Sequence, residues 1–148
     1  MAIEIVVRSQ LPEPLKKVVP NQKILKVAKK LLSDLECSEA ELSIAFISDA
    51  EILELNSSYR NKVSATDVLS FSQAPLLLGD IVISLETAQR QAQELGHGMY
   101  YEVIRLLVHG VLHLNGYEHE DVDNSVSEEM FSKERELMAM LETERLLD

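Results

Sequence analysis

Cysteine is nearly absent from this sequence, and long apolar runs are absent altogether. Cys37 is the only cysteine among 148 residues, so an internal disulfide and a cysteine-rich metal cluster are both excluded. No stretch reaches the ~20 consecutive apolar residues of a membrane span. The first ten residues carry Glu4 and Arg8 around a short apolar stretch and do not resemble a targeting segment. We therefore expect a soluble, cytoplasmic protein with no membrane partner.

Positive charge is also scarce, with 14 basic against 25 acidic side chains and a net charge of −11. This balance argues against a protein that coats nucleic acid nonspecifically, because phosphate binding needs clustered Lys and Arg. Residues 1–32 are the exception, with seven basic and two acidic side chains and a local charge of +5. Such a basic end could face RNA, but lysines 23, 26, 29 and 30 also fit the solvated face of a helix, which is the interpretation we favour.

The length and the 46% hydrophobic content indicate one globular domain spanning residues 1–148, with one active site. Apolar periodicity predicts strands at residues 3–8, 41–48, 67–72 and 79–84 and helices at residues 21–35, 49–59, 87–95, 100–115 and 125–146. The last two strands are expected to pair as a hairpin. The fold class is therefore α/β (α+β), with a small mixed β-sheet of about four strands covered by about five helices.

Two histidines stand four residues apart in a strongly apolar segment, residues 103–114. On an α-helix His109 and His113 lie about 6 Å apart along the axis and about 40° apart around it, so both imidazoles can reach one ion. A helix that is apolar on nearly every side is expected to be buried. Taken alone, this spacing fits a pair of satisfied core histidines better than a metal site.

The segment that follows, residues 114–119 (LNGYEH), changes this interpretation. Gly116 can adopt the left-handed conformation that ends a helix and reverses the chain, which would bring His119 back toward the pair. Three imidazoles leave the fourth tetrahedral position for water or substrate, as in catalytic zinc sites. We predict that His109, His113 and His119 bind one Zn²⁺, although imidazole ligands also suit nickel, copper and iron.

Metzincin metallopeptidases share this histidine spacing, which makes a peptidase the natural alternative. Those enzymes carry a glutamate directly after the first histidine as the general base, and this chain has Gly110 there. A metallopeptidase would need a carboxylate from elsewhere in the chain.

Four segments together closely resemble the YbeY family: residues 56–60 (NSSYR), 66–71 (TDVLSF), 78–83 (LGDIVI) and 109–119 (HGVLHLNGYEH). The resemblance implies a bacterial rRNA maturation factor, a zinc-dependent endoribonuclease that acts on single-stranded RNA in small-subunit rRNA processing and ribosome quality control. It also implies that the partners are rRNA and the ribosome or ribosomal proteins, not DNA. Glu118 and Ser72 depart from the aspartate and proline usual in the family, and neither is a proposed ligand.

Arg60 and Asp80 are the predicted catalytic residues outside the histidine set. By the resemblance, Arg60 occupies the position of the family's catalytic arginine, and a guanidinium can clamp a phosphate with two parallel hydrogen bonds. Its other possible role is a surface ion pair or a helix cap. Asp80, at a strand start, could orient a histidine ligand, assist a proton transfer or simply cap a turn. His97, between two glycines, is expected to be an exposed loop residue with no ligand role.

These residues predict an endoribonuclease in which zinc polarises a phosphate or activates a water and Arg60 stabilises charge on the phosphoryl oxygens. The general base is left open between metal-bound hydroxide, Asp80 and the 2′-hydroxyl of the RNA. Two other functions also stay open: another zinc hydrolase such as a metzincin-like metallopeptidase, and a non-enzymatic ribosome-assembly factor with structural zinc.

Overall fold

A four-stranded mixed sheet forms the centre of the fold. The computed structural model describes residues 2–8, 11–36, 41–60, 68–71, 77–115 and 124–147. The strands are β1 (Ala2–Val7), β2 (Glu41–Ile47), β3 (Val68–Phe71) and β4 (Leu77–Ser84). Their order is β1-β2-β4-β3, with β1, β2 and β4 parallel and β3 antiparallel to β4. The predicted mixed sheet and its hairpin are confirmed.

Six helices lie in the described part of the chain: α1 (Glu13–Lys16), α2 (Asn21–Asp34), α3 (Asp49–Arg60), α4 (Leu85–Leu95), α5 (Met99–Leu114) and α6 (Asn124–Thr143). All but α1 were predicted, with ends within about three residues. The single turn of α1, with a proline in its first turn and the buried Leu15, is too short for apolar periodicity to reveal. None of the helices in the described ranges is both long enough and apolar enough to cross a bilayer.

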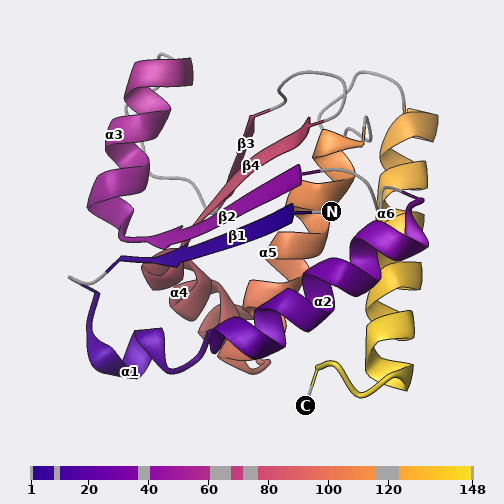
Figure 1. Ribbon diagram of the computed structural model, residues 1–148, viewed down its shortest axis with the longest axis horizontal. Helices are drawn as coiled ribbons and strands as arrows, with labels where there is room; N and C mark the ends of the chain where they lie inside the picture. The colour runs from indigo at the N-terminus through magenta and orange to yellow at the C-terminus, as the bar shows by residue number, and fades with distance from the viewer. Residues whose placement is uncertain are drawn as a thin grey trace.

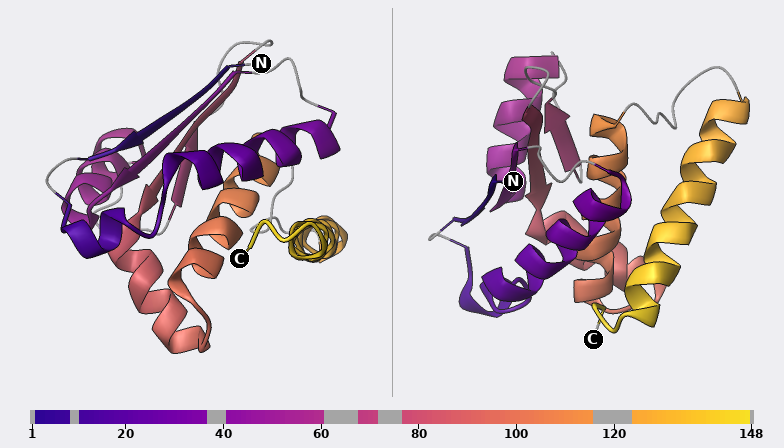
Figure 2. Two further views of the ribbon diagram at one scale, coloured as in Figure 1. Left: turned by 60° about the horizontal axis from the view of Figure 1, so that its bottom comes forward. Right: turned by 45° about the vertical axis from the view of Figure 1, so that its right-hand side comes forward.

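The two faces of the sheet are covered unequally (Figures 1 and 2). Side chains alternate along the strands, so one face presents a row of fully buried apolar residues, namely Ile44, Phe46, Ile81 and Ile83. Helices α2, α4 and α5 pack against this face, and α6 packs outside α5. Helix α3 covers part of the other face, where Ile52 packs with Ile47 and Val82.

Helix α5 is the central element of the helical layer. It contacts β3 and β4 as well as α2, α4 and α6, which explains why its sequence is apolar nearly all round. The closest approach to the sheet occurs at Gly110, where an added Cβ would lie 3.1 Å from Ile81 Cγ2. The prediction of a central buried helix that carries the histidine pair is therefore confirmed.

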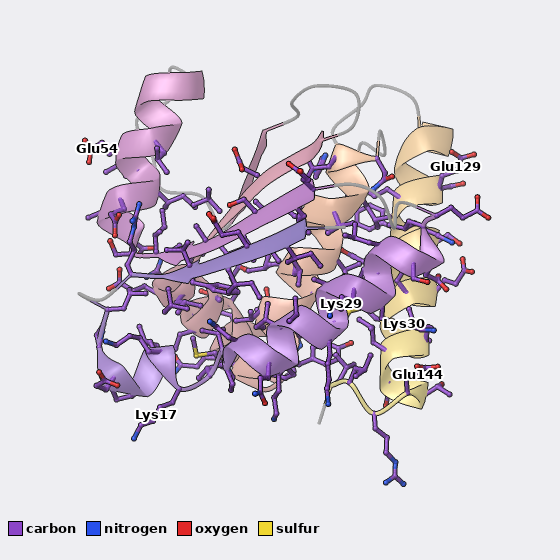
Figure 3. The ribbon with its side chains drawn as sticks, in the orientation of Figure 1. Lys17, Lys29, Lys30, Glu54, Glu129 and Glu144 are labelled. Atoms are coloured by element: carbon purple, nitrogen blue, oxygen red, sulfur yellow. The ribbon has the colours of Figure 1, made fainter. Side chains whose placement is uncertain are left out.

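The basic N-terminal residues lie largely on the outer surface. Lys17 and Lys29 are exposed, and Figure 3 shows Lys30 of α2 beside Glu144, which follows α6. Lys30 Nζ lies 3.6 Å from Glu144 Oε1. This arrangement agrees with the solvated helix face expected for the lysine-rich segment.

Two sets of hydrogen bonds stabilise the start of α3. The Ser48 hydroxyl accepts a hydrogen bond from the Glu51 N–H, and a second network is centred on Asp49. The Asp49 carboxylate accepts hydrogen bonds from the hydroxyls of Ser84 and Thr87 and from Arg90 Nη1 at 2.8 Å. Burial raises the pKa of the Asp49 carboxyl, but these three donors outweigh burial and hold the pKa below its usual value. The network thereby ties α3 to β4 and α4.

Asp49→Asn should lower the free energy of unfolding at pH 7 by about 1–3 kcal/mol, because it weakens charge-assisted hydrogen bonds to partly buried donors. Because the pKa of the Asp49 carboxyl is lower in the folded than in the unfolded protein, its charge stabilises the fold at pH values above the unfolded-state pKa of about 3.9. This stabilisation is lost as the pH falls through the folded-state pKa. Urea denaturation of the parent and the variant from pH 7 to pH 3 should therefore show a shrinking difference.

The control is Glu54→Gln, at an exposed position on the same helix (Figure 3). Its effect should stay within about 0.5 kcal/mol across the same range. A deficit for Asp49→Asn that is as large at pH 3 as at pH 7 would contradict the role of the carboxylate charge.

Candidate metal centre

The last two turns of α5 bring His109 and His113 together. Their Nε2 atoms lie 3.2 Å apart, and the rings meet edge to face with centroids 4.7 Å apart. Both side chains are partly buried. The two ring nitrogens therefore converge on one point beside the helix, as the four-residue spacing predicts.

This geometry fits a shared metal ion. Two imidazoles on one tetrahedral zinc, with Zn–N distances of about 2.0–2.1 Å, place their nitrogens about 3.3–3.4 Å apart, close to the observed 3.2 Å. The pair also lies at the carboxyl end of α5, where the partial negative charge of the helix dipole favours a cation. Both the donor chemistry and the spacing suit one divalent ion.

A carboxylate from α6 lies behind this pair. Glu134 Oε1 is 3.2 Å from His109 Nδ1, the ring nitrogen that points away from His113. Sequence reasoning missed Glu134. A signal was present, because the residues of α6 that face the core recur at helical spacing and Glu134 falls among them as a polar exception: Met130, Leu137, Met138 and Leu141.

The third predicted ligand, His119, lies outside the described residues, as does Glu118. Within the described ranges, no group of three His, Cys, Asp or Glu side chains comes together to hold a metal ion. The completed three-histidine set and its open fourth position therefore stay predictions.

His97 is not the exposed loop residue that the sequence suggested. Its side chain is 25% exposed, and its Nε2 lies 2.6 Å from Oε1 of Glu102, which is fully buried. Arg105 also donates two hydrogen bonds to Glu102. A buried carboxylate requires such partners, and the left-handed Gly96 lets the chain turn so that His97 can reach it. This cluster lies at the amino end of α5, away from the histidine pair.

Comparisons with known proteins agree with the motifs. A family model described as Endoribonuclease YbeY matches residues 11–142. This chain belongs to the YbeY family. An endoribonuclease YbeY from Aquifex aeolicus is 50% identical over 110 residues, covering 71% of this chain and 73% of that protein. One from Geobacter metallireducens is 38% identical over 133 residues, covering 84% and 89%.

A solution structure of a protein from Thermotoga maritima shares the fold of this YbeY chain. It has a TM-score of 0.60 and 24% sequence identity, and the match covers 99% of this chain and 95% of the other. At this level of identity the likeness concerns the fold alone. It supports the predicted mixed α/β architecture.

The YbeY resemblance also singled out Arg60, which is the last residue of α3. Its side chain lies outside the described part of the structure. Figure 1 shows the carboxyl ends of α3 and α5 at the same end of the molecule, with β3 and β4 between them. The backbone therefore places Arg60 at the end of the fold that carries the histidine pair, while its catalytic role stays a prediction.

Asp80 lies on β4, paired in register with Ser43 of β2 and Phe71 of β3. Alternation along the strand directs Asp80 to the face opposite Ile81, and Ile81 is the residue that packs under Gly110 of α5. The role of Asp80 in proton transfer stays a prediction.

Gly110 gives a physical reason why the metallopeptidase alternative does not suit this member of the YbeY family. The residue is buried, and a Cβ there would already lie 3.1 Å from Ile81 Cγ2. A glutamate side chain at this position would have to enter the packed contact between α5 and β4. A glutamate at the position where metzincins carry their general base is therefore absent from the sequence and disfavoured by the packing at Gly110.

His113→Ala should lose bound zinc, because removing one of three imidazoles leaves the ion with too few protein ligands. Metal analysis of protein purified without added metal would measure this loss. His97→Ala provides the matched control, since it changes a histidine outside the pair and should keep its zinc. Near-stoichiometric zinc in His113→Ala would rule out the proposed centre.

Proposed function

We propose that this protein is a zinc-dependent endoribonuclease that cleaves single-stranded RNA. It acts in the cytoplasm in rRNA maturation, through small-subunit rRNA processing and ribosome quality control. The observation that carries the proposal is the 3.2 Å approach of the His109 and His113 Nε2 atoms, in a chain whose relatives are endoribonucleases by name. A pair of ring nitrogens that suits zinc is what a metal-dependent nuclease needs at its centre.

His109, His113 and His119 would hold the ion, which when bound supplies a Lewis acid to the oxygens of the scissile phosphate. Arg60 donates two parallel hydrogen bonds to phosphoryl oxygens and stabilises the charge that develops on them. Asp80 is a candidate for the base that takes a proton. The 2′-hydroxyl of the RNA is a candidate for the attacking group: it would lose its proton to the base, bond to phosphorus and displace the 5′-oxygen. A role for the 2′-hydroxyl would restrict cleavage to RNA, because DNA lacks this group.

The acidic net charge of this protein limits its electrostatic attraction to RNA. With a net charge of −11, nonspecific attraction to phosphate is weak. Binding would therefore depend on a few local contacts, and on the ribosome or ribosomal proteins to bring the RNA to the site.

Arg60→Ala should separate chemistry from metal binding. The variant should keep its zinc and its melting temperature but lose on the order of 10²–10³ in kcat/KM for single-stranded RNA, as expected when a charge-stabilising donor is removed from a transition state. Arg60→Lys should restore little, because lysine keeps the charge without the bidentate fork. Arg135→Ala, at an exposed position on α6, should cleave RNA like the parent.

Cleavage by Arg60→Ala within about threefold of the parent would remove the catalytic role of Arg60, since threefold corresponds to only about 0.7 kcal/mol. Casein in the same assay tests the reaction class. Hydrolysis of casein but not of single-stranded RNA by the zinc-loaded parent would overturn the proposed function.

A further inference from the structure

Glu134 is a charged residue on the face of α6 whose other residues are apolar and buried. Met130, Leu137 and Leu141 on the same face are fully buried and pack in the main core. The Glu134 side chain is only 12% exposed. A carboxylate taken this far out of water is costly unless a hydrogen-bond donor compensates it, so its position needs a reason.

The donor that Glu134 meets is the ring of His109. Glu134 Oε1 lies 3.2 Å from His109 Nδ1, and the His109 side chain is 14% exposed. The opposite ring nitrogen, Nε2, is the one that faces His113 at 3.2 Å. The imidazole therefore bridges two different environments, with the carboxylate on one side and the candidate metal position on the other.

This arrangement selects one tautomer of the neutral ring. A carboxylate accepts a hydrogen bond only from a protonated nitrogen, so in the neutral ring the contact with Glu134 places the proton on Nδ1 and makes Nε2, the nitrogen that faces His113, the one that can bind a metal. Histidine ligands of zinc commonly donate their second N–H in this way, and the partner fixes the orientation of the ring. Leu137 and Leu141 on the same helix are buried in the core, and their packing sets which face of α6 is turned toward α5.

We propose that Glu134 is a positioning residue of the metal centre, which holds His109 in the tautomer and orientation that bind zinc. This inference rests on the proposed zinc site. Glu134 acts through His109 and touches neither the ion nor the RNA. Its removal should therefore weaken zinc binding, while the number of ions bound at saturating zinc stays the same.

The zinc dissociation constants of the parent, Glu134→Gln and Glu134→Ala, measured by competition with a chromophoric chelator, test this role. Glu134→Ala should raise the constant by about 10–100-fold. Glu134→Gln should have a smaller effect, because its amide oxygen still accepts from Nδ1 without the charge. The matched control is Glu136→Gln on the same helix, where the side chain is 66% exposed and pairs with Lys133, and its constant should stay within about twofold of the parent.

The histidine tautomer gives a second measurement that a purely structural role would not change. In the metal-free parent, long-range ¹H–¹⁵N spectra should show His109 protonated at Nδ1, and in Glu134→Gln this preference should weaken. Unchanged zinc affinity in both variants of Glu134 would overturn the inference even if their melting temperatures fall. Glu134→Gln is nearly isosteric and keeps this test available if the alanine variant does not fold.

The parent protein separates failure of this inference from failure of the proposed function. A parent that binds zinc tightly, together with Glu134 variants that bind it equally well, would remove only the role of Glu134. A parent that binds no zinc would overturn the metal centre and this inference with it. Cleavage of single-stranded RNA by the zinc-loaded parent tests the proposed activity and does not depend on the role of Glu134.

Discussion

The close packing of α5 against β4 is the contact on which the rest of this structure depends. Gly110 faces Ile81 so closely that even a methyl group would crowd it, and this approach sets how far α5 stands from the sheet. Residues on a helix turn by about 100° each, so the face of Gly110 also determines where its neighbours point. His109, one residue earlier, is thereby directed toward α6, where it meets Glu134.

Helix α5 is apolar along its length except for polar residues near each end, and these polar residues are hydrogen-bonded to polar side chains. At its amino end the fully buried Glu102 pairs with His97 and Arg105. At its carboxyl end His109 pairs with Glu134 and approaches His113. Because unpaired buried polar groups are costly, these polar contacts, together with the apolar packing, determine the position of each end of α5. The carboxyl end differs in that its pairing leaves two ring nitrogens directed at one point.

On the other side of the sheet, α3 carries the predicted catalytic arginine. Ile52 and the Asp49 network hold the first turns of this helix against β4 and α4. The last residue of the helix is Arg60, at the end of the molecule where α5 also ends (Figure 1). The helices that carry the predicted catalytic arginine and the histidine pair therefore end at the same end of the molecule, with β3 and β4 between them.

The sequence by itself determined every element except α1, together with the family and the histidine pair, because each is a local property. Strand alternation, helix periodicity and the spacing of His109 and His113 depend only on near neighbours in the chain. The tertiary structure alone decided which distant residues meet. It brought Glu134 to His109 across 25 positions, placed Gly110 of α5 against Ile81 of β4 and paired Asp80 of β4 with Ser43 of β2. Such pairings depend on how the packed helices are rotated about their axes and on strand register, and no local pattern encodes either of these.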